Sequence, residues 1–225
     1  MKFGPVPLDE AEGRILGHNV AGPDGRRLLR KGKALRQEDI ESLRKLGRRT
    51  VYVAELEGGD VEENRAAERI GRAAIGPGLR LSGPSTGRVN LISTVLGVFR
   101  FAPERLGALN AEEGVTIASL AAHAVARPGQ TVATVKVIPY AVPEEEVARA
   151  EAIARDRGPL LSVDALARRR VGLVLSGSPS VRMQLAESFT PLVERVAALG
   201  SEVVEQAYVT LEDENGEEAL AETLR

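Results

Sequence analysis

The sequence predicts an α/β protein whose N-terminal part is α+β and β-rich. The clearest pattern lies near the C-terminus, where an apolar run over 171–175 ends in small polar residues at 176–178. Such a run is typical of a buried strand that ends in a loop. A helical pattern follows over 190–199, then a strand-like run over 203–209 and a helix over 217–225. This order predicts the first β-α-β-α of an open parallel sheet.

The helix expected over 190–199 has clear start and stop signals. It opens with Thr190 and Pro191, and proline suits a first turn because it has the helical φ and lacks an otherwise unpaired N–H. Apolar residues then recur with helical spacing up to Gly200, which suits a helix end. Because a parallel sheet needs both faces covered and usually more than two strands, we expect this last domain to be incomplete in the chain.

The N-terminal part predicts a small α+β domain over residues 1–76. Apolar residues with helical spacing favour a helix over 37–46, and Gly47 suits the left-handed position that commonly ends a helix. The alternating valines over 51–53 then indicate a half-buried strand.

A second helix is expected after this strand. Asp60, followed three residues later by Glu63, fits the capping pattern of a helix start, and the helix would run to about Ala74. The breaker sequence Gly76-Pro77-Gly78 then marks the first domain boundary.

The segment 79–142 predicts a β-rich domain. One or two helical turns are expected over 103–109, and Arg127-Pro128-Gly129 indicates a turn. Residues favoured in strands gather in four runs, which are 88–93, 95–101, 115–120 and 131–140.

Residues 143–170 are expected to form a helix and a linker. Acidic residues at 144–146 occupy the first turn of this helix and basic residues the last, which complements the helix dipole. Gly158 ends the helix, and the last domain then covers residues 171–225.

The composition limits the classes of function. The chain has 225 residues, no cysteine, no tryptophan and 3% aromatic residues. Without cysteine, disulfides and thiolate metal sites are excluded, and a cytoplasmic location is expected. The few aromatic residues and the net charge of −2 disfavour nucleic-acid binding, and no run approaches the ~20 apolar residues of a membrane span. The basic residues between Arg26 and Arg49 are either an anion-binding patch or, by preference, a solvated surface.

Three other features carry weaker signals. The stretch from Gly83 to Gly87 matches the G-x-S-x-G hydrolase pattern, but a strand is expected to follow it, so a plain turn is the better interpretation. His18 and His123 lack further ligands at helical spacing, so no protein-bound metal is expected. Lys136, flanked by valines, is expected to point outward from a strand.

The loop after the first C-terminal strand is the strongest candidate site, and no residue is assigned a catalytic role. Ser176, Gly177 and Ser178 would let a ligand approach the backbone, with hydroxyl and amide groups donating to anionic oxygens. Arg182 could add a charge-assisted hydrogen bond to a phosphate. An ordinary strand-to-helix connection, in which the serines cap the backbone, explains the same residues equally well.

Several segments resemble the molybdopterin-binding proteins of molybdenum cofactor biosynthesis. The N-terminal segment is similar to the one that precedes the cofactor-binding domain of molybdopterin molybdenumtransferases, and it contains Arg30-Lys-Gly-Lys-Ala-Leu35, Asp39-Ile40, Leu43, Leu46-Gly47 and Val51-Tyr-Val53. The segment Val171-Gly-Leu-Val-Leu-Ser-Gly177, with the helix and strand that follow, resembles the opening of that domain. Residues 1–10 and 129–139 resemble a subgroup of these proteins.

The resemblance implies a protein that binds molybdopterin, or its nucleotide form, during molybdenum cofactor maturation or handover. Ser176, Gly177, Ser178 and Asp213 would then be half of the site, with the family's Gly-Gly-Ser/Thr loop after a third strand missing from the chain. Ser178 also departs from the usual continuation of the first loop. The resemblance implies a homo-oligomer and, for the intact parent protein, a transferase, whereas this chain alone is not expected to be catalytic.

A non-catalytic assembly module is the alternative hypothesis. In this interpretation the β-rich middle and the basic N-terminal part dock a partner protein, and the C-terminal α/β part only completes an oligomer.

Overall fold

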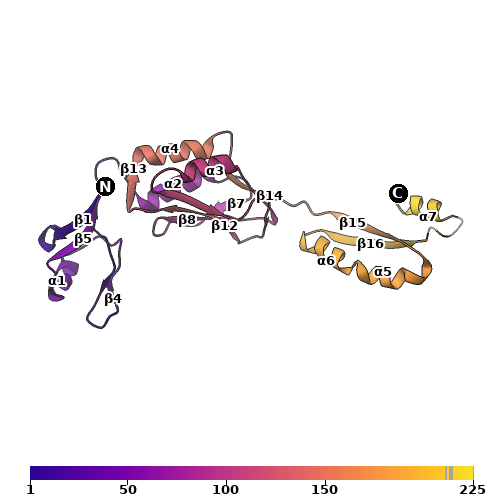
Figure 1. Ribbon diagram of the computed structural model, residues 1–225, viewed down its shortest axis with the longest axis horizontal. Helices are drawn as coiled ribbons and strands as arrows, with labels where there is room; N and C mark the ends of the chain where they lie inside the picture. Colours follow the sequence, from indigo (N-terminus) through magenta and orange to yellow (C-terminus); the bar gives the residue numbers. More distant parts are fainter. Residues whose placement is uncertain (211, 213–214, 225) are drawn as a thin grey trace.

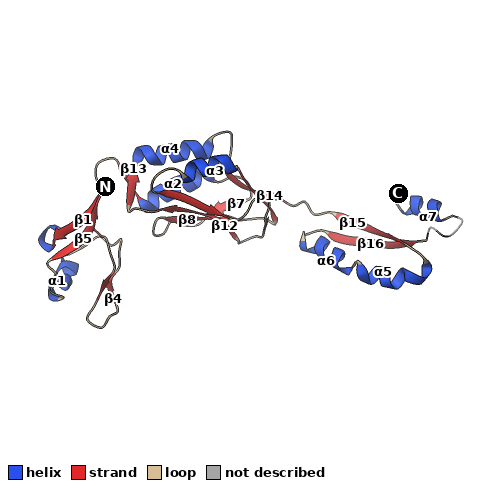
Figure 2. Ribbon diagram, in the orientation of Figure 1, coloured by secondary structure: helices blue, strands red, loops and turns tan. Residues whose placement is uncertain are grey.

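The computed structural model describes residues 1–210, 212 and 215–224. These residues form a mixed α/β structure of several small sheets flanked by helices (Figure 2). Figure 1 shows them as three units in a row. We call these the N-terminal unit (residues 1–59), the middle unit (residues 60–165) and the C-terminal unit (from residue 170 onward).

The N-terminal unit packs one α-helix against a small antiparallel sheet. Its elements are β1 (Lys2–Pro7), the 3-10 helix η1 (Leu8–Glu10), β2 (Ile15–Leu16), β3 (Val20–Ala21), β4 (Arg27–Leu29), α1 (Gln37–Lys45) and β5 (Thr50–Glu55). Strand β5 lies between β1 and β2, while β3 and β4 form a separate hairpin.

Leucine, isoleucine and valine side chains form the core of this unit. Ile40 and Leu43 lie on the buried face of α1, and Val51 and Val53 lie on the buried face of β5. These residues recur with the helical and the strand period, so the helix and the strand predicted here are confirmed.

The middle unit is built from antiparallel sheets and three helices. Its elements are β6 (Asp60–Glu62), α2 (Glu63–Ala74), β7 (Leu79–Leu81), β8 (Arg88–Ser93), β9 (Gly97–Phe101), α3 (Pro103–Asn110), β10 (Val115–Ser119), β11 (Val125–Ala126), β12 (Thr131–Val137), β13 (Ala141–Pro143), α4 (Glu144–Arg155) and β14 (Leu161–Ala165). The largest sheet has the strand order β10-β12-β8-β7, and a second has the order β11-β9-β14. A short ladder pairs β13 with β6.

One continuous hydrophobic core runs through the middle unit. It contains residues of α2 and α4 together with those of the sheets, whereas the core of the N-terminal unit ends at Val53. The chain therefore passes from one hydrophobic core to the next between Val53 and Val61. This point precedes the domain boundary that the sequence predicts near residue 76. Strand β14, within the segment expected as a linker, pairs with β9. Helical periodicity shows that a helix has an apolar face, but not which sheet that face will contact.

The start of α2 differs from the predicted cap. Asp60 lies in β6 rather than at the helix end, and its carboxylate accepts from the Glu57 amide at 2.7 Å. Glu62 caps the helix instead, because its side chain accepts from the amides of Asn64 and Arg65 at 2.9 and 3.1 Å. The pairing of β6 with β13 keeps Asp60 extended, so the helix begins only at Glu63.

The C-terminal unit contains a parallel pair of strands with helices beside it (Figure 1). Its elements are β15 (Arg170–Ser176), the 3-10 helix η2 (Pro179–Val181), α5 (Arg182–Ser188), α6 (Thr190–Ala198), β16 (Glu202–Val209) and α7 (Gly216–Thr223). Both strands and the helix starting at Thr190 are confirmed. Part of the stretch expected as a loop is the helix α5, whose Met183-Gln-Leu-Ala-Glu187 consists of good helix formers.

Few side chains of the C-terminal unit are buried. Among its described residues only Leu175, Val209 and Gly216 are buried, whereas Met183 is 78% exposed. A two-stranded sheet usually needs further strands or packed elements to be stable. The structure shows the parallel pairing of β15 with β16. A larger open sheet that contains this pair stays a prediction.

In the part of the chain that the structure describes, no helix combines the length and the apolar character that crossing a bilayer requires.

Arg69 connects the two long helices of the middle unit. From α2, its guanidinium donates to both carboxylate oxygens of Glu144 at 2.6 and 2.7 Å and to both of Glu151 at 3.1 and 3.0 Å. These hydrogen bonds hold the pKa of Arg69 well above its ordinary value. Bidentate pairs of this kind fix geometry as well as adding stability, so Arg69 sets how α4 lies along α2.

Replacing Arg69 with alanine is expected to destabilise the middle unit by about 1–3 kcal/mol, since the largely buried Glu151 loses its main partner. The matched control is Arg72→Ala, which removes an exposed i,i+4 pair with Glu68 and should cost only about 0.3–0.5 kcal/mol. Hydrogen exchange of the α2 and α4 amides measures both effects. Equal losses in the two variants would contradict this role of Arg69.

Asp39 is a buried carboxylate in the N-terminal unit. Burial alone would raise its pKa, but hydrogen bonds from the Lys33 ammonium and the Arg36 amide outweigh burial and lower that pKa. Because the folded pKa lies below the unfolded one, the stabilisation is fully present above the unfolded value. It is lost as the pH falls through the folded pKa.

Acidification below the ordinary aspartate pKa of 3.8 is therefore expected to destabilise α1 and its surroundings. In an acid titration at fixed urea, amide NMR signals of α1 should report this unfolding. The variant Asp39→Asn should be less stable at neutral pH and should show a smaller acid dependence. An unchanged acid dependence in this variant would show that other carboxylates dominate.

Candidate functional site

The strand-end loop, which we define as residues 176–182, lies at the carboxyl end of β15. Ser176 is exposed at the end of this strand, and the Gly177 amide donates to Val209 O at 3.3 Å. The Tyr208 hydroxyl donates to Ser178 O at 2.6 Å. A Cβ on Gly177 would lie 2.8 Å from that hydroxyl, so the tyrosine needs a glycine beside it.

Two short contacts connect polar groups of the strand-end loop and β16. The hydroxyls of Ser178 and Ser180 are 3.1 Å apart, and the guanidinium carbon of Arg182 lies 5.5 Å from the centre of the Tyr208 ring. The structure thus brings Ser178 and Arg182 together around Tyr208. Ser180 belongs to the same candidate loop of the sequence as Ser176 and Ser178, whereas sequence reasoning missed Tyr208. Asp213 lies outside the described residues.

The strand-end loop offers three hydroxyls, those of Ser176, Ser178 and Ser180, and the Arg182 guanidinium to an anion. The Gly177 amide is already engaged by β16, so the expected backbone cradle is only partly available. Helix α5 is too short to add much positive potential of its own. The loop can therefore position an anion through side chains, while an ordinary strand-to-helix connection accounts for the same hydrogen bonds.

A second site, which the sequence did not predict, lies where the N-terminal unit meets the middle unit. We call it the interunit cleft. Tyr140, just before β13, crosses this junction, and its hydroxyl donates to Gly17 O at 2.7 Å. The cleft has a volume of about 560 Å³, and its lining includes Phe3, His18, Lys31, Glu63, Lys136 and Tyr140.

Lys136 and Glu63 form the floor of the interunit cleft. The Lys136 ammonium lies 3.7 Å from Glu63 Oε2 and donates to Thr86 O at 2.8 Å, and the two side chains are only 26% and 14% exposed. Lys136 does point away from the valine face of β12, as expected. The start of α2 and the loop at Thr86 cover it there, which the strand pattern alone does not reveal.

The backbone at this floor has an unusual conformation. Thr86 has a φ of 51°, which is rare for a β-branched residue, and Gly87 follows with a φ of 65°. A Cβ on Gly87 would lie 2.7 Å from Glu63 Oε2 and 2.8 Å from Lys136 Nζ. Strained backbone of this kind costs about 1–3 kcal/mol and is found preferentially at functional sites.

Burial shifts the titration of three groups in the interunit cleft. It raises the pKa of Glu63 and lowers that of Lys136, although each partner partly opposes the effect on the other. Burial also raises the pKa of Tyr140. Nearby Arg88 and Lys31 lower the Lys136 pKa further. Shifted groups within a cavity are a recognised mark of binding sites.

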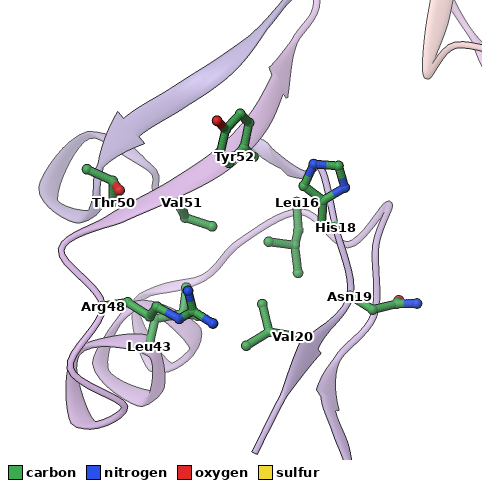
Figure 3. A pocket seen from close by; sticks show the side chains of 9 residues that line it. All are labelled: Leu16, His18, Asn19, Val20, Leu43, Arg48, Thr50, Val51 and Tyr52. Atoms are coloured by element: carbon green, nitrogen blue, oxygen red, sulfur yellow. The ribbon is translucent and has the colours of Figure 1, made fainter.

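A smaller cavity of about 180 Å³ lies within the N-terminal unit (Figure 3). Figure 3 shows the Arg48 side chain near Leu43 and Val20, with His18 and Tyr52 at the other end of the cavity. Its volume is below the range of about 300–1,000 Å³ that is usual for ligand pockets. Its lining contains one cation and no carboxylate, so it offers less chemistry than the interunit cleft.

The remaining sequence candidates can now be placed. Ser85 lies in a turn, in which the Ser85 amide donates to Arg88 O and the Arg88 amide donates to Ser85 O. Strand β8 follows directly, so the segment that matches the hydrolase pattern is a turn before a strand. Among the described residues, no three His, Asp or Glu side chains lie close enough together to hold a metal ion. His18 lies instead with aromatic rings, at 5.6 Å from Phe3 and 5.4 Å from Tyr52.

Comparison with protein families matches residues 5–55 to a domain of unknown function (DUF8806). The match begins within β1 and ends with β5, so it covers most of the N-terminal unit. Neither the comparison with curated proteins nor that with solved structures found a match. These comparisons therefore name no ligand for this chain.

Replacing Gly87 with alanine is expected to destabilise the middle unit by about 1–3 kcal/mol. Alanine would have to adopt the φ of 65°, and its Cβ would lie 2.7 Å from Val137 O and against the Glu63–Lys136 pair. Gly83→Ala is the matched control, since a Cβ there meets nothing within 4 Å. Thermal unfolding followed by circular dichroism compares the variants. Similar midpoints would show that the loop adapts and that Gly87 is not required.

Proposed function

We propose that this chain binds the phosphate of molybdopterin, or of its nucleotide form, at the strand-end loop. In this proposal the protein acts in the maturation or handover of the molybdenum cofactor and works as a homo-oligomer. The observation that carries the proposal is the grouping of Ser178, Ser180 and Arg182 at the carboxyl end of a parallel strand. Ligand sites of parallel sheets lie at that end of the strands.

Two contacts support a binding role for Arg182. The guanidinium lies against the Tyr208 ring, which limits its freedom before a ligand arrives, and the Tyr208 hydroxyl is itself fixed on Ser178 O. A guanidinium held in this way loses little further entropy when it donates to phosphate oxygens.

We further propose that β15 and β16 are the first strands of a larger parallel sheet. The pair buries few side chains, and a site at its end would gain donors from the loops of additional strands. The segments that resemble molybdopterin-binding proteins agree with this arrangement.

A non-catalytic assembly role is the second candidate. The exposed apolar side chains of the C-terminal unit favour it, since surfaces of this kind commonly mark contacts with other protein. They are Val181, Met183, Leu192, Leu199, Val204 and Leu224.

Calorimetric titration of the chain with molybdopterin under anaerobic conditions tests the proposal. We expect saturable binding that Arg182→Gln weakens about tenfold or more, because a charge-assisted hydrogen bond is lost. Arg195→Gln is the matched control, since it removes an exposed arginine from α6 in the same unit. Absence of binding, together with concentration-dependent self-association in sedimentation velocity, would replace the cofactor role with the assembly role.

A further inference from the structure

We propose that the interunit cleft is a second binding site, for a small molecule in which a planar ring carries a phosphate group. The site is distinct from the strand-end loop in unit and in residues. It combines a cavity of suitable size, an excess of cationic side chains and a cluster of exposed aromatic rings.

The cavity is large enough for such a molecule. The interunit cleft of about 560 Å³ adjoins a second hollow of about 400 Å³, and the two share Lys31, Glu63, Thr86 and Tyr140 in their lining. Small-molecule sites usually measure about 300–1,000 Å³ and lie between units of structure.

The charges that line the two hollows leave a positive excess. The Lys33 ammonium pairs with Asp39, and the Met1 amine pairs with Glu57 and Asp60. In the part of the chain that the structure describes, neither Arg30 nor Lys31 has an ion-pair partner, and Lys136 has Glu63 alone. Three cations, Arg30, Lys31 and Lys136, thus face the two carboxylates of Glu62 and Glu63.

An anion would relieve this imbalance. Lys136 lies near the like charges of Lys31 and Arg88, and burial already disfavours its ammonium form. A phosphate between Lys31 and Lys136 would accept charge-assisted hydrogen bonds from both. The half-buried Lys136 is fixed by Thr86 O, so one donor is already positioned before binding.

The aromatic side chains of the cleft are the reason that the proposed ligand contains a planar ring. The chain has only three tyrosines and four phenylalanines, yet Phe3 and Tyr140 line this cleft with His18, and Tyr52 packs beside Phe3. The Phe3 and Tyr140 rings are 17° from parallel with centroids 6.3 Å apart, and Phe3 is 46% exposed. Exposed rings beside cations are the combination that binds flat heterocycles carrying phosphate.

Gly17 makes this aromatic wall possible. A Cβ at Gly17 would lie 2.7 Å from the Phe3 ring and 2.9 Å from Tyr52 O. Because Gly17 has no side chain, the Phe3 ring lies directly on the Gly17 backbone. Gly17 O also accepts a hydrogen bond from the Tyr140 hydroxyl of the middle unit. The wall is therefore held by both units.

Titrating the full chain with AMP, adenosine and ribose 5-phosphate, followed by amide NMR, tests the proposal. AMP supplies both the ring and the phosphate, so we expect it to bind saturably and more tightly than either part. Lys31→Ala should weaken AMP binding about tenfold, whereas Lys45→Ala, an exposed lysine of α1 outside the cleft, should not. Phe3→Leu should remove the advantage of AMP over ribose 5-phosphate.

A second arm distinguishes a purine ring from a pterin ring. Molybdopterin is titrated into the Arg182→Gln chain, in which the strand-end loop is impaired, with and without Lys31→Ala. Saturable binding of AMP or molybdopterin that depends on Lys31 supports the interunit site. Absence of saturable binding by both, or equal effects of Lys31→Ala and Lys45→Ala, overturns it. Because the proposed function depends on Arg182 and not on Lys31, the two ideas fail separately.

Discussion

Close packing of helix α2 against β8 and β12 is the contact on which the middle unit depends. The buried face of α2 consists mostly of alanine and glycine, and a Cβ on Gly71 would lie 3.3 Å from both Leu81 and Val89. Small residues let the helix lie close to the sheet, where each added methylene would have to displace a neighbour. Arg69 then holds α4 beside α2 through two carboxylates. Because β6 leads into α2 and β13 leads into α4, this packing also fixes the β6–β13 ladder.

The interunit cleft follows from the same arrangement. The β6–β13 ladder places Glu63 and Tyr140 at the edge that faces the N-terminal unit, and the Glu63 amide donates to Tyr140 O at 2.8 Å. The turn at Thr86 and Gly87 then closes over Glu63 and Lys136. The strained residue therefore lies where charges, rings and a cavity meet, rather than in a turn without other features. Such strain persists because the surrounding contacts over-determine it.

The C-terminal unit has a different physical basis. Its strands and helices follow from strong local signals, namely an apolar run, the Thr190-Pro191 helix start and a second apolar run. Local signals produce elements, but stability comes mainly from buried apolar area, and this unit buries little of it. Its elements are thus well specified by sequence, while little buried apolar area holds them together.

By itself, the sequence determined the elements whose periodicity or breakers are local. The helix at 37–45, the strand over 50–55 and the parallel strand pair follow from apolar spacing, and the loop at 176–182 follows from its small polar residues. Tertiary structure alone decided that α2 belongs to the middle core, that Glu62 rather than Asp60 caps it, and that Lys136 faces Glu63. It also gathered Phe3, His18 and Tyr140, which are far apart in the chain. Periodicity reports which face of an element is apolar, whereas a site depends on which faces meet, and that is fixed only by packing across the whole chain.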